Sequence, residues 1–313
     1  MATFLVTGGA GFIGSHIAEA LVRRGDRVRI LDNLCTGFRN NFAEFADDVE
    51  FIEGDISEPA VVAKAVRGVE CVFHEAALAS VPLSVERPLD SNRACVTGTL
   101  NVLDQAQRAG VRRVVYAGSS AAYGDRPNSS KRESDMPMIL SPYAAAKLAG
   151  ELYCQAFYHT HGLETVCLRY FNVFGPRQDP NSAYSAVIPL FITKLLARQS
   201  PVVFGDGLQS RDFTFVENVV HGNLLAAEAV DAPGKTFNLA DGRSTTLLQL
   251  LRLLETLLEV EVKPIHEAPR LGDVRESLAD INAATTVLGY EPQITFEEGL
   301  RRSIDYYRSV VAG

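Results

Sequence analysis

The chain has 313 residues, 47% of them hydrophobic, which is enough for the core of one large domain or two moderate ones and excludes a disordered chain. Acidic residues exceed basic ones by eight, and the basic residues are scattered, which argues against a nucleic-acid partner. The five cysteines are odd in number and contain no CxxC pair, so neither a disulfide framework nor a metal site is expected.

The first residues, MATFLVTGGAGFIGSH, have no basic leader before their apolar stretch, so no signal peptide is expected. No apolar run approaches the roughly 20 residues that span a bilayer. These features predict a cytoplasmic protein with no membrane partner.

Short β-rich segments alternate with helical segments in the first third of the chain. The expected strands are residues 4–7, 27–32, 50–55, 71–76 and 112–118, and the clearest helices are residues 13–25 and 99–110. This alternation predicts right-handed βαβ units, and therefore an α/β fold with a doubly wound parallel sheet. Gly25 and Gly110 are expected to end the two helices.

After about residue 175 the pattern loosens, and prolines and glycines separate the periodic segments. Residues 245–258 and 295–310 have the pattern of amphipathic helices. We expect residues 1–174 to form the sheet domain, to which the chain later returns, and residues 175–313 to form mainly a smaller α/β lobe. Such a lobe would cap the C-terminal ends of the strands, where ligands bind in open α/β sheets.

A glycine-rich segment, TGGAGFIG, joins the first strand to the first helix. Gly9, Gly11 and Gly14 fit the GxGxxG pattern, and Gly8 replaces Gly9 in the variant with a wider first gap. Glycines let the backbone approach a pyrophosphate, whose charge is then met by the helix N-terminus. The context predicts a Rossmann-type dinucleotide domain; the alternative is a turn that only packs the helix on the sheet.

Two acidic residues follow neighbouring strands. Asp32 ends the second strand, about 20 residues after the loop, where a carboxylate binds the ribose hydroxyls and repels a 2′-phosphate. It therefore favours NAD over NADP. Asp55 follows the third strand and is either a contact for the adenine edge or a loop acid that caps a helix.

The segment SPYAAAK places Tyr143 and Lys147 one turn apart on one helix, with Ser141 as the expected N-cap. An ammonium beside a phenol favours the phenolate, which is a usable general base. The spacing alone also fits a half-buried aromatic residue beside a solvated charge. Ser119 and Ser120 favour the chemical interpretation, because they end a strand at the edge where the glycine loop would hold its dinucleotide.

With these segments in this order, the chain resembles the extended short-chain dehydrogenase/reductases over essentially its full length. Within them it is similar to the NAD-dependent nucleotide-sugar 4-epimerases, the UDP-glucose 4-epimerase family. The resemblance is closest to the UDP-N-acetylglucosamine 4-epimerases, through HEAALASVPLSVERP, RYFNVFGPRQDPNSAYSAVIP, FGDGLQSRDFTFVENVV and RLGDVRESLADI. It implies an isomerase that epimerises UDP-hexoses at carbon 4 through a 4-keto intermediate.

The resemblance also implies roles for particular residues. Tyr143, as phenolate, would take the proton of the sugar 4-hydroxyl with help from Ser119, and Lys147 would hold the nicotinamide ribose. The implied cofactor contacts are Gly8, Gly11, Phe12, Ile13, Gly14, Asp32, Asn33, Asp55, Ile56, Ala76, Ala77, Tyr143, Lys147 and Tyr170. The implied substrate contacts are Ser80, Ser119, Ser120, Tyr143, Asn172, Ala186, Val187, Phe204, Arg211, Arg270 and Ser277. A homodimer is implied as well, built on the helix before Gly110 and the helix that begins at Pro142.

Substrate size follows from two small residues. Epimerases restricted to glucose and galactose carry a bulky aromatic residue at the position of Ser277 and a lysine at the position of Ala79. Small residues at both positions permit an acetamido group without requiring it, because a wider pocket rejects a smaller analogue only weakly. The resemblance therefore favours UDP-GlcNAc and UDP-GalNAc, with activity on UDP-Glc and UDP-Gal left open. At the position of Cys95 the family usually has an asparagine that binds the cofactor. A cysteine is a poorer hydrogen-bonding partner, so how tightly NAD is retained is left open.

Other functions on the same scaffold compete with this one. Dehydratases and UDP-glucuronate decarboxylases that resemble this family carry acids after the catalytic hydroxyl, where this chain has Ser120 and Ala121, so those reactions are disfavoured. UDP-glucuronate 4-epimerisation stays open, because it needs only a pocket that tolerates the carboxylate. A non-catalytic NAD-binding scaffold is disfavoured, because Ser119, Tyr143 and Lys147 are all present.

Overall fold

The computed structural model describes residues 2–126, 130–180, 186–269 and 274–312. Its centre is a seven-stranded parallel sheet with the order β11-β6-β5-β4-β1-β2-β3. The strands are β1 (Thr3–Thr7), β2 (Arg27–Asp32), β3 (Val49–Glu53), β4 (Cys71–His74), β5 (Arg113–Ser119), β6 (Glu164–Tyr170) and β11 (Thr236–Leu239). The first five confirm the strands predicted from the sequence. The fold is the Rossmann-type α/β fold that the alternation predicted.

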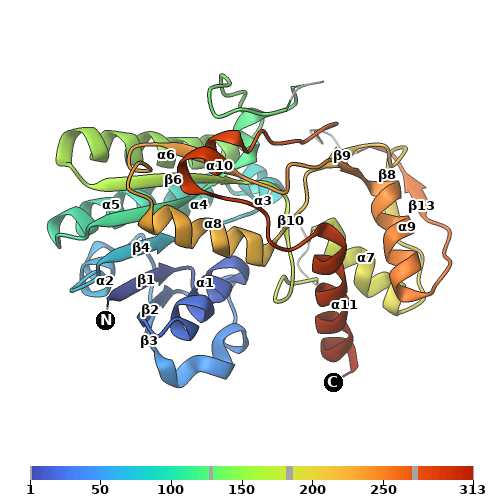
Figure 1. Cartoon of the computed structure of the whole chain (residues 1–313), viewed down its shortest axis with the longest axis horizontal. Coiled ribbons are helices and arrows are strands. Elements are labelled where there is room, and N and C mark those ends of the chain that lie inside the picture. The colour runs from blue at the N-terminus through green and yellow to red at the C-terminus, as the bar shows by residue number, and fades with distance from the viewer. Residues whose placement is uncertain (1, 127–129, 181–185, 270–273, 313) are drawn as a thin grey trace.

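Helices cover both faces of this sheet (Figure 1). One face packs against α1 (Phe12–Arg23), α8 (Val216–Glu228) and α10 (Asn282–Leu288), and the other against α2 (Pro59–Ala65), α5 (Gly98–Arg108) and α6 (Pro142–His161). Gly25 and Gly110 have positive φ just past α1 and α5, as expected of helix-ending glycines. The remaining helical segments of this part are η1 (Arg39–Asp48), α3 (Val81–Glu86), α4 (Pro88–Asn92), the π turn η2 (Arg93–Thr97) and η3 (Ser120–Tyr123).

A second group of elements lies beside the C-terminal ends of the central strands (Figure 1). Its helices are α7 (Val187–Leu196), α9 (Leu247–Leu258) and α11 (Phe296–Ala312), and its strand pairs are β7 (Val173–Phe174) with β10 (Thr214–Phe215), β8 (Val202–Phe204) with β13 (Ile265–Glu267), and β9 (Ser210–Arg211) with β12 (Thr245–Thr246). This group has its own core, which includes Phe174, Ile192 and Leu250. Among the described helices, none combines the length and apolar character required to cross a membrane.

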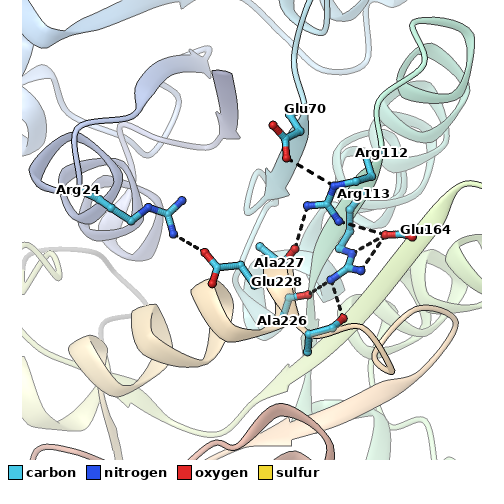
Figure 2. Close-up of polar contacts among 9 residues, drawn as sticks. Arg24, Glu70, Arg112, Arg113, Glu164, Ala226, Ala227 and Glu228 are labelled. Carbon is cyan, nitrogen blue, oxygen red and sulfur yellow. Dashed lines mark hydrogen bonds and ion pairs between the residues drawn. The ribbon is translucent and has the colours of Figure 1, made fainter. Parts of the chain in front are cut away.

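The N-terminal ends of the central strands carry a charged network (Figure 2). Arg113, only 2% exposed, donates from Nη1 to the carbonyl oxygens of Ala226 and Ala229, both at 2.9 Å, and pairs with Glu164 at 2.8 Å. Arg112 donates to Ala227 O at 3.1 Å. Two arginines thus satisfy the last carbonyls of α8 and oppose its negative end, which fixes that helix on the sheet.

We expect Arg113→Met to lower the free energy of unfolding by about 3 kcal/mol, because the change leaves helix-end carbonyls and Glu164 without a buried partner. Denaturant titration measures this loss. Arg301→Met is the matched control: Arg301 pairs with Glu297 at 2.7 Å on the surface of α11, so its removal costs about 0.5 kcal/mol or less. Equal losses in the two variants would contradict the assigned role of Arg113.

Candidate active site

The glycine loop adopts a shape that only glycine permits at two positions. Gly8 has φ of +70°, and a Cβ atom there would lie 2.7 Å from the Ala76 nitrogen. A Cβ atom on Gly14 would lie 2.2 Å from the Gly8 oxygen. Gly11 is the N-cap of α1 and has no side chain to satisfy the N–H groups of the first turn. The loop therefore presents bare backbone donors and a positive helix end, which fits the pyrophosphate of NAD.

The acidic residues predicted for the adenosine end lie close together. Asp32 is 8% exposed, and its carboxylate accepts hydrogen bonds from Ala10 N at 3.0 Å and Leu34 N at 2.8 Å. Burial, stronger than these hydrogen bonds, raises the pKa of Asp32. Asn33 Nδ2 donates to Asp55 Oδ2 at 3.1 Å, so the ends of β2 and β3 are joined by a polar pair. This arrangement offers acceptors to ribose hydroxyls at the end of β2.

Hydrogen bonds hold the carboxyl of Asp55 in place: Ser57 N donates to one of its oxygens and Asn33 Nδ2 to the other. Burial is the largest single influence and acts to raise its pKa, but hydrogen bonds from Ser57 and Asn33 and the charge of Arg93 together hold the pKa below its usual value. Ile56, predicted at the adenine, is 6% exposed and packs in the core, where its side chain fills the space left by Gly98.

A buried hydrogen-bonded chain that the sequence did not predict runs beneath the cofactor cleft. Thr99 Oγ1 donates to Cys95 O at 2.7 Å, so it accepts from His74 Nε2 at 2.9 Å. His74 Nδ1 then accepts from Thr7 Oγ1 at 2.7 Å, and Thr7 Oγ1 accepts from Ala76 N at 3.3 Å. The ring of His74 is neutral, because burial and the charge of Lys147 lower its pKa to about 3. These hydrogen bonds hold the segment after β4, which includes Ala76 and Ala77, against the glycine loop. Cys95 itself is 1% exposed and lies in the π turn η2.

The three predicted catalytic residues come from β5 and α6. Ser119 ends β5 and accepts a hydrogen bond from Ala121 N at 3.2 Å through Oγ, while Ser120 begins η3. Ser141 caps α6 as predicted, with Ala144 N donating to its Oγ at 3.2 Å. Lys147 is 3% exposed and its ammonium donates to Ala117 O at 2.7 Å, two residues before Ser119. The lysine and the serine therefore lie at one end of one strand, and half-buried Tyr143 stands one helical turn before Lys147.

The start of α6 is also tied to α3. Ser84 Oγ accepts a hydrogen bond from Tyr143 N at 3.0 Å. Ser80, predicted to contact substrate, is the N-cap of α3 and accepts from Leu83 N at 3.2 Å. The segment that carries Ala79 and Ser80 therefore approaches the first turn of α6.

A cavity of about 510 Å³ lies within the second group of elements, with Asn172, just after β6, in its wall. Its lining includes five residues predicted to bind substrate, namely Asn172, Ala186, Val187, Phe204 and Arg211, and also Lys194, Gln209 and Glu267, which were not predicted. Aromatic and aliphatic residues supply most of the rest, including Phe191 and Phe213. Apolar walls with a few cations suit a flat base attached to a phosphate chain.

Asp212 holds three segments of this region together. Its buried carboxylate accepts hydrogen bonds from Asp241 N at 3.0 Å and from Gly242 N and Ala279 N at 3.1 Å each. Burial raises its pKa to about 7. Asn172 Nδ2 donates to Asp212 O at 3.2 Å and to Ser277 Oγ at 3.4 Å, which brings two predicted substrate residues together.

The remaining predicted site residues lie in different parts of the structure. Phe12 and Ile13 open α1 and pack against the core of the second group of elements. Tyr170 ends β6, opposite Ser119 in the strand register, and is 8% exposed. Arg270 lies outside the residues that the structure describes. Among the described residues, no group of three or more His, Cys, Asp or Glu side chains could hold a metal ion.

Comparison with known proteins identifies the family of this chain. The model of the NAD dependent epimerase/dehydratase family matches residues 4–240. A putative UDP-glucose 4-epimerase of Methanocaldococcus jannaschii is 37% identical over 307 residues, which cover 97% of this chain and 98% of that protein. A UDP-glucuronate 4-epimerase of Thermodesulfobacterium geofontis is 32% identical over 320 residues, with coverage of 98% and 96%.

Solved structures give the same result. The UDP-N-acetylglucosamine 4-epimerase of Methanobrevibacter ruminantium, in complex with UDP-N-acetylmuramic acid, is 40% identical, covers 99% of each chain and superposes with a TM-score of 0.94. The glycine loop, the acidic pair and the Ser119, Tyr143 and Lys147 arrangement thus occur in a chain that aligns with these enzymes over nearly its full length. The chain belongs to the NAD dependent epimerase/dehydratase family, and its cofactor is NAD.

Proposed function

We propose that this chain epimerises UDP-hexoses at carbon 4, with UDP-GlcNAc and UDP-GalNAc as the preferred pair and UDP-Glc and UDP-Gal as further substrates. The observation that carries the proposal is that Ser119 and Lys147 meet at the C-terminal end of β5, with Tyr143 one helical turn before Lys147, on the edge of the sheet where β1 leads into the glycine loop. A reaction that oxidises and re-reduces one sugar carbon needs a proton acceptor beside the dinucleotide.

Each catalytic residue has a distinct task in this proposal. Bound NAD would supply the hydride acceptor and donor for carbon 4, which the residues around it serve. Tyr143 takes the proton of the 4-hydroxyl and later gives it back, and Ser119 aligns the hydroxyl by hydrogen bonding. Lys147 favours the phenolate by its charge, and its hydrogen bond to Ala117 O holds the ammonium in place.

The cavity supports a uridine diphosphate as the recognised group. Arg211 and Lys194 line it and supply cationic donors for a diphosphate, and Phe204 and Phe213 supply apolar surface for the base. If the nucleotide supplies most of the binding energy, the sugar itself can be bound weakly. The 4-keto sugar is then able to rotate in the site.

A neutral sugar is favoured over a uronic acid. A relative named as a UDP-glucuronate 4-epimerase makes UDP-glucuronate the second candidate substrate. The described residues assigned to the sugar end, Ala79, Ser80, Ser119 and Ser277, carry no charge. Moving a uronate carboxylate from water into this site would cost free energy, because none of these four residues offers it a cationic partner.

We also propose that the protein is a homodimer through α6. Leu152 is 56% exposed on this helix and Leu89 is 82% exposed on neighbouring α4, whereas Phe157 packs into the core. Burying the two leucines against a second copy would remove apolar surface from water. Sedimentation analysis of wild type and Leu152→Glu tests this arrangement.

We expect Tyr143→Phe to lower kcat for UDP-GlcNAc epimerisation by about 10²–10⁴-fold with little change in stability, because the change removes only the proton acceptor. Chromatographic assay of UDP-GlcNAc and UDP-GalNAc measures the loss. Tyr153→Phe is the matched control, since Tyr153 is a partly exposed tyrosine on the same helix. Full activity in Tyr143→Phe would refute the proposed function, and so would an inactive wild type.

Replacing the small wall residue Ser277 should change the substrate preference. We expect Ser277→Tyr to lower kcat/KM for UDP-GlcNAc at least about tenfold relative to UDP-Glc, because the phenyl ring occupies the space that an acetamido group requires. Ser277→Ala removes the hydrogen bond with Asn172 without adding bulk, so the ratio should stay near that of wild type. A parallel loss for both substrates in Ser277→Tyr would show that Ser277 does not face the acetamido group.

A further inference from the structure

One ionisable side chain in the cofactor cleft has no task in the proposed reaction. Glu75 directly follows β4 and is half-buried. Tyr170 Oη lies 2.8 Å from Glu75 Oε1, and Asn223 Nδ2 donates to Tyr170 Oη and to Val219 O, both at 2.8 Å. Because Asn223 donates to the phenol, the hydroxyl proton of Tyr170 is free to point at Glu75. Residues of β6 and α8 therefore fix this carboxyl in place.

The strand register places Glu75 at the edge of the sheet between the glycine loop and Lys147. His74 pairs with Tyr116 of β5, so Glu75 lies beside Ala117, whose oxygen accepts the Lys147 ammonium. On the other side, the next residue contacts the glycine loop, since a Cβ atom on Gly8 would lie 2.7 Å from Ala76 N. A dinucleotide that runs from Asp32 over this loop to Ser119 must cross the end of β4.

We propose that Glu75 tunes the redox balance of the bound cofactor by placing a negative charge beside the nicotinamide half. Reduced NAD carries one more negative charge than oxidised NAD, so a nearby carboxylate favours the oxidised form. Glu75 forms no ion pair with the described residues, and of its two carboxyl oxygens only Oε1 is hydrogen bonded among them. Lys147, the cation that acts on it, is beyond ion-pair distance, so it compensates the charge only in part. The inference requires that NAD binds, but it does not require any particular sugar substrate.

The ionisation of Glu75 is compatible with this role. Burial raises its pKa to about 7, against the opposing effects of the Tyr170 hydrogen bond and the Lys147 charge. The carboxylate therefore dominates only above neutral pH. Of the other groups around it, His74 is neutral because burial lowers its pKa to about 3, and burial keeps Tyr170 protonated by raising its pKa well above the usual value.

The test is the rate at which bound NAD is reduced in the holoenzyme by a neutral amine–borane, which donates a hydride from boron to the nicotinamide ring without a sugar. A neutral reductant is used because an anionic one would itself respond to the removed charge. At about pH 8.5 we expect Glu75→Gln to be reduced about tenfold faster than wild type. The absorbance band of reduced nicotinamide gives the rate.

Glu261→Gln is the matched control, because Glu261 is an exposed residue just after α9, and its rate should equal that of wild type. Wild type alone supplies a second measurement: its rate should rise towards that of Glu75→Gln as the pH falls through about 7, while the variant stays flat. Equal rates in wild type and Glu75→Gln, a Glu75→Gln variant that purifies without NAD, or a wild-type rate independent of pH would each overturn the proposal. None of these outcomes depends on epimerase activity.

Discussion

The attachment of α6 to β5 is the constraint on which the active site depends. The Lys147 ammonium donates to Ala117 O at 2.7 Å, and Tyr116 Oη donates to Lys147 O at 3.1 Å, so helix and strand are joined in both directions. One turn further along, buried Glu151 and Arg169 pair at 2.8 Å and extend the connection to β6. Three contacts along one face of α6 leave little freedom to shift, so its first turn is held beside the cofactor cleft.

Two glycines make this close approach possible. A Cβ atom on Gly118 would lie 2.9 Å from Glu151 Oε1, and one on Gly150 would lie 2.2 Å from Tyr116 Oη. The opposite end of the same strands carries the network of Arg112 and Arg113, which holds α8 and takes no part in the chemistry. The sheet thus separates a stabilising end from a reactive end, as expected where the carboxyl ends of parallel strands bind ligands.

What could be predicted from the sequence was local or motif-like. The glycine loop, Asp32 and the Tyr143 and Lys147 pair lie within short segments whose spacing directly reflects their chemistry. The contacts among Glu75, Tyr170 and Asn223 could not be predicted, because residues far apart in the chain meet only through the strand order and the packing of α8. Lys194 was missed for a similar reason: nothing in its own helix shows that it faces a cavity whose other walls come from β7, β8, β9 and β13.

The proposed reaction oxidises one carbon and reduces it again within a single site, with the removed hydrogen kept on the cofactor. The most direct measurement uses UDP-GlcNAc labelled with deuterium at carbon 4, incubated with the holoenzyme in ordinary water and followed by NMR. The account predicts that UDP-GalNAc forms with the deuterium retained at carbon 4. Product that has exchanged this deuterium for solvent hydrogen, or the absence of any product, would contradict it.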